Sequence, residues 1–541
     1  MSAYRTAPDH DETGWPKGVP YIIGNEACER FSYYGMRAIL FVYLVQLWTQ
    51  QGVGTELAER QATDVVHTFI AGVYALPMIG ALIADRFWGK YPTILWLSLA
   101  YCVGHGCLAL FEDDFTGFGL GLVLICIGAG GIKPCVSAHV GDQFGRGNWN
   151  KVERVYQAFY FAINFGSVFA TLLIPWLRAR FGFGVAFAVP GVLMAVATVW
   201  FWWGRKVFVH VPPRPGGKLG AIDVLSGMLL FMTLLLPMFG GGIVPGYAAL
   251  SVALKVLVSL ACLALGLAVF GYRQRLAPDD GFLAVLVHCL RARLRGERVA
   301  GEATPESKLS AFWRPAVVRF GAEAAEGPPA VLRIVSVFAL VSMFWALFDQ
   351  HTSSWIAQAR EMDRHVALFG MSFELLPDQI QAANPALVML LVPLTSYVIY
   401  PGIERVLRIR MTPLRRMTLG MFLTSLSFVI VALLQARIDA GERVHIGSQM
   451  IAYLVLTAAE VMVSINGLEF AYTQAPRRMK SLVSGLWLLA VSFGNILVAL
   501  LARFESLPRV QFFWTFAGLM FGAALLFGLR AAFYRYQTYT Q

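Results

Sequence analysis

The sequence predicts an all-α polytopic membrane protein with about fourteen transmembrane helices, and three observations lead to this prediction. Hydrophobic residues make up 57% and charged residues 14% of the 541-residue chain, whereas soluble domains average about 25% charged residues. Apolar runs of about 20 residues, the length needed to cross a bilayer as a helix, recur along the chain. The basic residues gather in alternate loops, as is typical of loops that stay in the cytoplasm.

The apolar runs divide the chain into six spans, a pair of spans and six more. The first six lie near 22–48, 64–85, 91–111, 118–138, 155–176 and 183–203. A break rich in proline, glycine and basic residues follows at 212–218, then runs at 219–239 and 248–270 and a polar stretch at 271–329. The last six lie near 331–358, 379–407, 411–434, 446–472, 480–502 and 510–533. We therefore expect an N-terminal six-helix bundle (1–203), a linker with two extra transmembrane helices and a basic cytoplasmic segment (204–330), and a C-terminal six-helix bundle (331–541).

The net charge of +11 does not indicate a nucleic-acid partner, because the basic residues are distributed by loop. They concentrate at 86–90, 146–154, 205–218, 273–319, 405–416 and 477–480. This positive-inside pattern predicts a multi-pass protein of the plasma membrane or bacterial inner membrane, with both termini in the cytoplasm. Residues 1–20 are polar, so we expect no cleaved signal peptide.

Within the polar linker, residues 282–294 are first apolar and then basic. Such a segment is typical of a short helix that lies on the anionic inner leaflet. A plain solvated linker explains the same residues equally well, so both interpretations stay open.

Several chemical classes lack their signatures. The seven cysteines include no CxxC pair, so we expect no disulfide and no metal site. The chain has no Walker A motif, since Gly89-Lys90 is followed by Tyr91, and no HExxH or GxSxG motif. We therefore expect neither an enzyme nor an ATP-driven pump, and no cofactor.

The first span carries an unusual stripe of charge. Glu26, Glu29, Arg30, Tyr33 and Arg37 share one helical face. A charge at bilayer depth costs roughly 2.5–3.5 kcal/mol on insertion scales, so this stripe should face a polar cavity. It is a candidate for handling substrate or protons; the alternative is a structural ion pair near the cytoplasmic end of the helix.

The stripe belongs to a longer motif. Residues 26–35, EACERFSYYG, resemble the ExxERFxYYG motif of the proton-coupled oligopeptide transporters, the peptide branch of the major facilitator superfamily. Segments 130–144, 159–167, 344–350 and 467–476 are also similar to segments of that family, and the loop 80–90 resembles the signature loop of the superfamily. The resemblance runs from the first span to the eleventh and is closest to the animal transporters and their bacterial relatives. It implies two six-helix bundles around a central cavity, with the extra pair of helices at the periphery.

This resemblance directs attention to residues that suit a peptide. A site that takes many peptide sequences must grip the ends that all peptides share. Arg30 and Lys133 suit the substrate carboxylate, and Glu469, in the opposite half, suits the ammonium. Asn164 and Asn384 can bond the peptide backbone. Aromatic walls would come from Tyr33, Tyr34, Tyr74, Tyr160, Trp345 and Trp487, for each of which plain packing is the alternative.

Proton coupling needs a carboxyl group that can exchange its cationic partner, because burial raises a carboxyl pKa and a nearby cation lowers it. We expect Glu26 or Glu29 to lie near Lys133 and to take up a proton when the substrate carboxylate competes for that lysine. Glu460, nine residues before Glu469, is expected on the opposite helix face, as packing or as a secondary proton site.

The resemblance further implies that Arg37 and Asp349 form an extracellular gate that opens when Asp349 is protonated. His67 aligns with the functional histidine of the animal transporters, and histidine titrates near physiological pH. A satisfied helix histidine is the alternative for that residue.

The function implied is a proton-coupled symporter, acting as a monomer, that imports di- and tripeptides by alternating access. Two alternatives stay open. The same scaffold could carry nitrate or another small anion, although such a substrate has no ammonium for Glu469. A peptide-binding membrane receptor would bind the same ligands without moving them.

Overall fold

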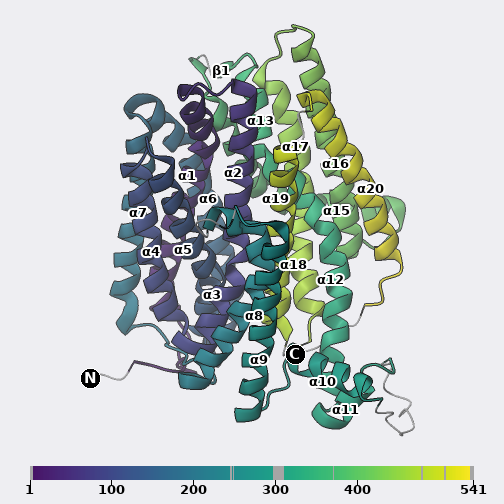
Figure 1. Cartoon of the computed structure of the whole chain (residues 1–541). Helices are drawn as coiled ribbons and strands as arrows, with labels where there is room; N and C mark the ends of the chain where they lie inside the picture. The colour runs from purple at the N-terminus through teal and green to yellow at the C-terminus, as the bar shows by residue number, and fades with distance from the viewer. Residues whose placement is uncertain are drawn as a thin grey trace.

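The computed structural model describes residues 4–243, 247, 249–296, 310–368, 371–476, 479–504 and 507–536. Within these residues the chain is helical apart from loops and one two-stranded hairpin. Thirteen helical stretches of the described chain are long and apolar enough to cross a membrane. The charged first helix, α1 (Val19–Gln50), lies beside them and completes the expected number (Figure 1).

The N-terminal half packs around α1. This helix begins with Pro20 in its first turn, where the missing N–H group costs nothing, and it contacts α2, α6 and α7. The remaining elements are α2 (Thr55–Ala75), α3 (Pro77–Ile83), the π-helical turn η1 (Ala84–Trp88), α4 (Lys90–Leu110), α5 (Phe115–Asp142), η2 (Arg146–Lys151), α6 (Val152–Phe181), α7 (Phe183–Trp203) and η3 (Gly204–Lys206). Their buried apolar side chains form one continuous core.

The linker contains the two predicted extra helices, α8 (Gly217–Ile243) and α9 (Val252–Leu276). Helix α8 packs on α3, and α9 packs on α8. Only 6% of the apolar 18-residue stretch of α9 is buried inside the protein. The pair therefore lies at the periphery, as expected. Two short helices follow, α10 (Phe282–Leu294) and α11 (Arg314–Phe320).

Helix α10 has the bounds of the apolar and basic segment singled out in the sequence, so that segment is helical. Its inner face is held by a small apolar cluster, made by Val285, Cys289, Trp313, Ala316 and Ala325. The cluster joins α10 to α11 and to the start of α12, and it fixes the basic segment against the protein.

The C-terminal half has its own core around Phe428, Phe513 and Phe516. Its elements are α12 (Ala322–Phe348), η4 (Asp349–Thr352), α13 (Ser354–Arg360), β1 (His365–Leu368), β2 (Met371–Glu374), η5 (Pro377–Ala382), α14 (Ala383–Leu394), η6 (Thr395–Ile399), α15 (Tyr400–Leu407), α16 (Pro413–Asp439), η7 (Ile446–Ser448), α17 (Gln449–Glu460), η8 (Val461–Ile465), α18 (Asn466–Gln474), α19 (Lys480–Phe504) and α20 (Arg509–Ala532). The strands pair antiparallel, with Val366 opposite Phe373.

The structure corrects the bounds of several predicted spans. The expected span 331–358 is α12, which begins earlier, at Ala322, and continues through Pro328 and Pro329. Adjacent prolines favour a boundary in sequence reasoning, but here they lie inside the helix. The same helix ends at Phe348, where Asp349 starts the tighter turn η4.

The two ends of the molecule differ (Figure 1). The β1–β2 hairpin marks one, which we call the hairpin end. The chain termini mark the other, the terminal end: the N–H of His210 donates to the carbonyl of Arg5 at 2.7 Å, and the N–H of Leu414 donates to Tyr536 Oη at 3.4 Å. Helices α10 and α11 also lie there.

A close contact between α3 and α5 provides a test of this packing. A Cβ atom on Gly80 of α3 would lie 2.4 Å from the Cα atom of Gly131 in α5, so Gly80→Ala should force the two helices apart. We expect a loss of about 1–3 kcal/mol, seen as a lower thermal unfolding temperature in detergent. Gly106→Ala is the control, because nothing lies within 4 Å of its Cβ position. Equal unfolding temperatures would contradict the close packing.

Candidate functional site

Three charged side chains of α1 form a compact buried group. Arg30 Nε lies 2.6 Å from Glu26 Oε1 and 3.2 Å from Glu29 Oε2. Glu26 is 2% exposed and Glu29 is fully buried. Because Glu26 and Arg30 are one turn apart, the local helix geometry makes the stronger contact by itself. Removing one member of such a buried group leaves the others buried without a partner, which lowers the stability of the fold by roughly 3–5 kcal/mol.

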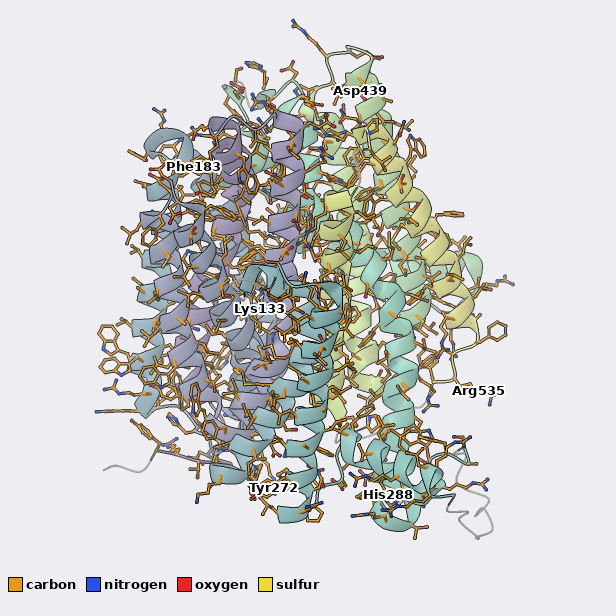
Figure 2. The ribbon with its side chains drawn as sticks, in the orientation of Figure 1. Lys133, Phe183, Tyr272, His288, Asp439 and Arg535 are labelled. Carbon is orange, nitrogen blue, oxygen red and sulfur yellow. The ribbon has the colours of Figure 1, made fainter. Side chains whose placement is uncertain are left out.

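Lys133 of α5 lies beside this group. Its Nζ atom is 4.2 Å from the ring centroids of both Tyr33 and Tyr74, and Figure 2 shows the residue midway between the two ends. The atom is buried and has no hydrogen-bond partner among the described residues. The two rings attract the cation but offer no lone pair of the kind that an ammonium prefers. The three N–H groups of Lys133 are therefore available to an anionic ligand.

The expected pairing of Lys133 with a glutamate is not the arrangement found. Within the described part of the chain no carboxylate lies within 4 Å of Lys133 Nζ, and Arg30 holds both Glu26 and Glu29. The physical reason is proximity, since Arg30 shares a helix with both acids and needs no movement between helices to reach them.

The residues expected at the gate are connected across the two halves. Arg37 Nη1 lies 3.5 Å from Asp349 Oδ1. Asn495 Nδ2 donates to Asp349 Oδ2 at 2.7 Å, and Asn495 Oδ1 lies 2.7 Å from His67 Nδ1. His67 Nε2 lies 2.8 Å from Ser353 Oγ. His67 therefore reaches Asp349 through Asn495 and not directly.

The hydrogen bonds of this network show which side-chain atoms carry a proton. Because the Asn495 amide donates to Asp349, its oxygen must accept, so His67 Nδ1 carries a proton. His67 Nε2 is then the acceptor for the Ser353 hydroxyl if the ring is neutral. Sequence reasoning missed Asn495 and Ser353. An asparagine inside the apolar run of α19 was the available signal, because polar groups at membrane depth are costly unless partnered.

In the C-terminal half, Asn384 is already engaged. Its Nδ2 donates to Glu460 Oε2 at 2.7 Å and to Thr457 Oγ1 at 3.2 Å, so in this conformation its amino group is not open to a peptide backbone. Glu469 is exposed and forms no ion pair with any residue that the structure describes. The π-helical turn η8 lies between the two glutamates.

The two predicted tryptophans pack on each other. The rings of Trp345 and Trp487 are 6.2 Å apart at nearly a right angle. Trp487 is 3% exposed and covers Gly467, where an added Cβ would overlap the indole ring. Trp345 Nε1 is buried without a hydrogen-bond partner among the described residues.

The remaining predicted residues lie on α1 and α6. Tyr34 contacts Tyr33 edge to face, with ring centroids 5.4 Å apart. Asn164 Nδ2 donates to the carbonyl of Tyr160 at 2.9 Å, one turn back along α6. The side chain of Tyr160 is 42% exposed, which leaves its ring open to a ligand.

The two halves are held together at the hairpin end. Five ion pairs cross between them in the described part of the chain. They are Arg37–Asp349, Arg178–Asp378, Arg360–Glu59, Arg503–Asp64 and Arg509–Glu59. Two of these pairs use Arg360 and Asp378, which lie just before and just after the β1–β2 hairpin. The basic loop 477–480 is outside the described residues at 477 and 478. Among residues that are described, no ion pair joins the halves at the terminal end.

Comparison with known proteins gives consistent matches. The model of the POT family matches residues 91–226 and 310–515. Peptide transporter family 1 of Drosophila melanogaster is 34% identical over 439 residues, which are 79% of this chain and 48% of that protein. The crystal structure of an auto-inhibited POT family peptide transporter is 36% identical with a TM-score of 0.77, over 97% of this chain and 99% of that one. The POT family transporter PepTSo is 38% identical with a TM-score of 0.75, over 96% and 98%. The chain spans about half the length of the curated relatives it matches.

The Asn495 network provides a test of the gate geometry. Asn495→Leu leaves Asp349 Oδ2 and His67 Nδ1 without their partners, and each stranded buried group costs about 1–3 kcal/mol. We expect a clear fall in the thermal unfolding temperature. Thr515→Val is the control, because the exposed Thr515 hydroxyl bonds only to its own helix, at the carbonyl of Gln511. An unchanged temperature for Asn495→Leu would contradict the network.

Proposed function

The chain belongs to the POT family, and on that premise we propose that it is a proton-coupled symporter that imports di- and tripeptides. The observation that carries the proposal is the buried, unpartnered ammonium of Lys133 beside the Glu26, Glu29 and Arg30 group. A cation without an anion at this depth is costly, and a peptide carboxylate would supply the missing partner. No enzymatic reaction is proposed, because the relatives are named as transporters.

The peptide would bridge the two halves. Its carboxylate would bind Lys133 and Arg30 in the N-terminal half, and its ammonium would bind Glu469, which has no competing ion pair among the described residues. Trp345 Nε1 and the exposed ring of Tyr160 would contact the peptide between its ends. Asn384 would have to exchange Glu460 for the peptide, and Asn164 would have to release the Tyr160 carbonyl to donate to it.

The same group supplies a route for proton coupling. Arg30 holds two carboxylates, so a peptide carboxylate that competes for Arg30 would release one of them. The released Glu26 or Glu29 would then be a buried carboxylate without a cation, which favours uptake of a proton. Protonation of Asp349 would weaken its bond to Arg37 and loosen the gate, with His67 acting through Asn495.

Alternating access gives the ion pairs a role. The five pairs that cross between the halves would close the hairpin end while the site communicates with the terminal end. Because the basic loops gather at the terminal end, we place this end and both termini in the cytoplasm of a plasma membrane, that of a bacterium being the inner membrane. The chain would work as a monomer, since both halves of the site come from the same chain.

Transport in liposomes tests the function. The purified full chain is reconstituted, an inward proton gradient is imposed, and labelled dialanine is followed. We expect concentrative uptake that other dipeptides compete for and that free alanine and nitrate leave unchanged. Competition by nitrate would favour an anion transporter, and peptide binding without uptake would favour a receptor.

Proton coupling is tested at Glu29. In Glu29→Gln the side chain keeps its shape and cannot exchange a proton, so gradient-driven accumulation of dialanine should be lost while exchange of peptide across the membrane continues. Glu442→Gln, which removes the exposed partner of Arg437, should behave as the unmodified chain. Retention of full coupling by Glu29→Gln would remove Glu29 from this role, and loss in Glu26→Gln alone would assign it to Glu26.

A further inference from the structure

A second polar cavity lies far from the central site, at the terminal end. It is enclosed by the end of α9, one face of α10 and the end of α11, and its volume is about 330 Å³, within the range of ligand cavities. Figure 2 shows Tyr272 and His288, which belong to α9 and α10, both well below Lys133 at this end. The wall residues are Phe270, Gly271, Gln274, Ala284, Val287, His288, Arg291, Ala292, Arg295, Arg319 and Phe320.

The charged side chains in the described wall of this cavity are basic. Arg291, Arg295 and Arg319 contribute to the wall, and no carboxylate is among the described residues that form it. Arg319 Nη1 lies 3.4 Å from His288 Nδ1, so the guanidinium is directed across the space between α10 and α11. The nearby Asp279 is already bound by Gln274 Nε2 at 2.9 Å. A phosphate is the anion that clustered arginines recognise best.

An apolar path leads from the membrane into the cavity. Val256, Leu260, Leu263 and Leu267 lie on one face of α9 at helical spacing and are 52%, 55%, 36% and 40% exposed. Phe270 and Gln274 continue the same face, and both belong to the cavity wall. An acyl chain on this face would therefore end where the arginines begin.

We propose that the cavity binds the phosphate headgroup of an anionic glycerophospholipid whose acyl chains lie along α9. Basic pockets at the cytoplasmic side of membrane helices provide this kind of site. The apolar face distinguishes the ligand from a soluble phosphate, which would gain nothing from the exposed leucines. The bound lipid would link the peripheral helix α9 to α10 and α11, and this proposal does not depend on the transported substrate.

Lipid binding to the full chain tests the proposal. The protein is delipidated in detergent and titrated with dioleoylphosphatidylglycerol or dioleoylphosphatidylcholine, and bound lipids are counted by native mass spectrometry. Arg291→Gln with Arg319→Gln should weaken phosphatidylglycerol binding on the order of tenfold and leave phosphatidylcholine binding unchanged. Arg291→Lys with Arg319→Lys should retain part of the affinity.

The matched control is Arg275→Gln with Arg293→Gln. These arginines belong to α9 and α10, which also line the cavity, but they are exposed and are outside the cavity wall. The net charge changes equally, and binding should stay as in the unmodified chain. Equal loss in both double variants would show diffuse attraction and overturn the site. Displacement of the lipid by equimolar inorganic phosphate, or equal binding of dihexanoyl and dioleoyl lipid, would overturn the acyl contact. Thermal unfolding of each variant shows that lost binding does not reflect lost folding.

Discussion

The buried ion group of α1 is the constraint on which the rest of the structure depends. Arg30 and its two glutamates cannot face lipid without a large cost in free energy, so α1 must be covered on its charged side. On that side Tyr33 packs on Phe69 of α2, Lys133 of α5 lies over the Tyr33 ring, and Arg37 pairs with Asp349 of the other half. Gly35 and Gly166 allow α6 to approach the opposite side of α1 closely. The N-terminal bundle is thus organised around a helix that would be a poor membrane span on its own.

Two kinds of polar contact join the halves toward the hairpin end, in addition to the apolar packing of α2 and α3 on α19. At the rim, the pairs of Glu59 with Arg360 and Arg509 and of Asp64 with Arg503 are partly exposed to water, so each contributes little by itself. Deeper, the bonds among His67, Asn495 and Asp349 are shielded from water and leave unpaired groups when they break. A protein that rocks its halves must break both sets. The rim pairs can separate at low cost, so the deeper network sets the stability of the closed end.

Much of this was open to prediction from the sequence, and the limits have physical causes. Hydropathy and charge located the membrane-spanning helices, because both depend on residue type and spacing. For residues 282–294 they left a short helix and a solvated linker equally open, and the structure shows the helix. The pairing of Arg30 with Glu26 follows from helical spacing alone. The distance between Lys133 and the glutamates cannot be derived from helical spacing, because it depends on how α1 and α5 pack against each other. Asn495 was missed for the same reason, since its partners His67 and Asp349 lie on two other elements, α2 and η4.

The π-helical turn η8 changes the rotation about the helix axis between the residues before it and the residues after it. Glu460 and Glu469 are nine residues apart, about two and a half turns of a regular α-helix, which would set them on opposite faces. A π turn takes an additional residue to close, so the rotation between them is smaller than the count of residues suggests. In effect, residues 461–465 act as a one-residue insertion. Deleting one residue there would therefore leave a regular α-helix in which Glu460 and Glu469 keep nearly the same relative direction, whereas converting the π turn to α-helix without a deletion would turn Glu469 by roughly 100°.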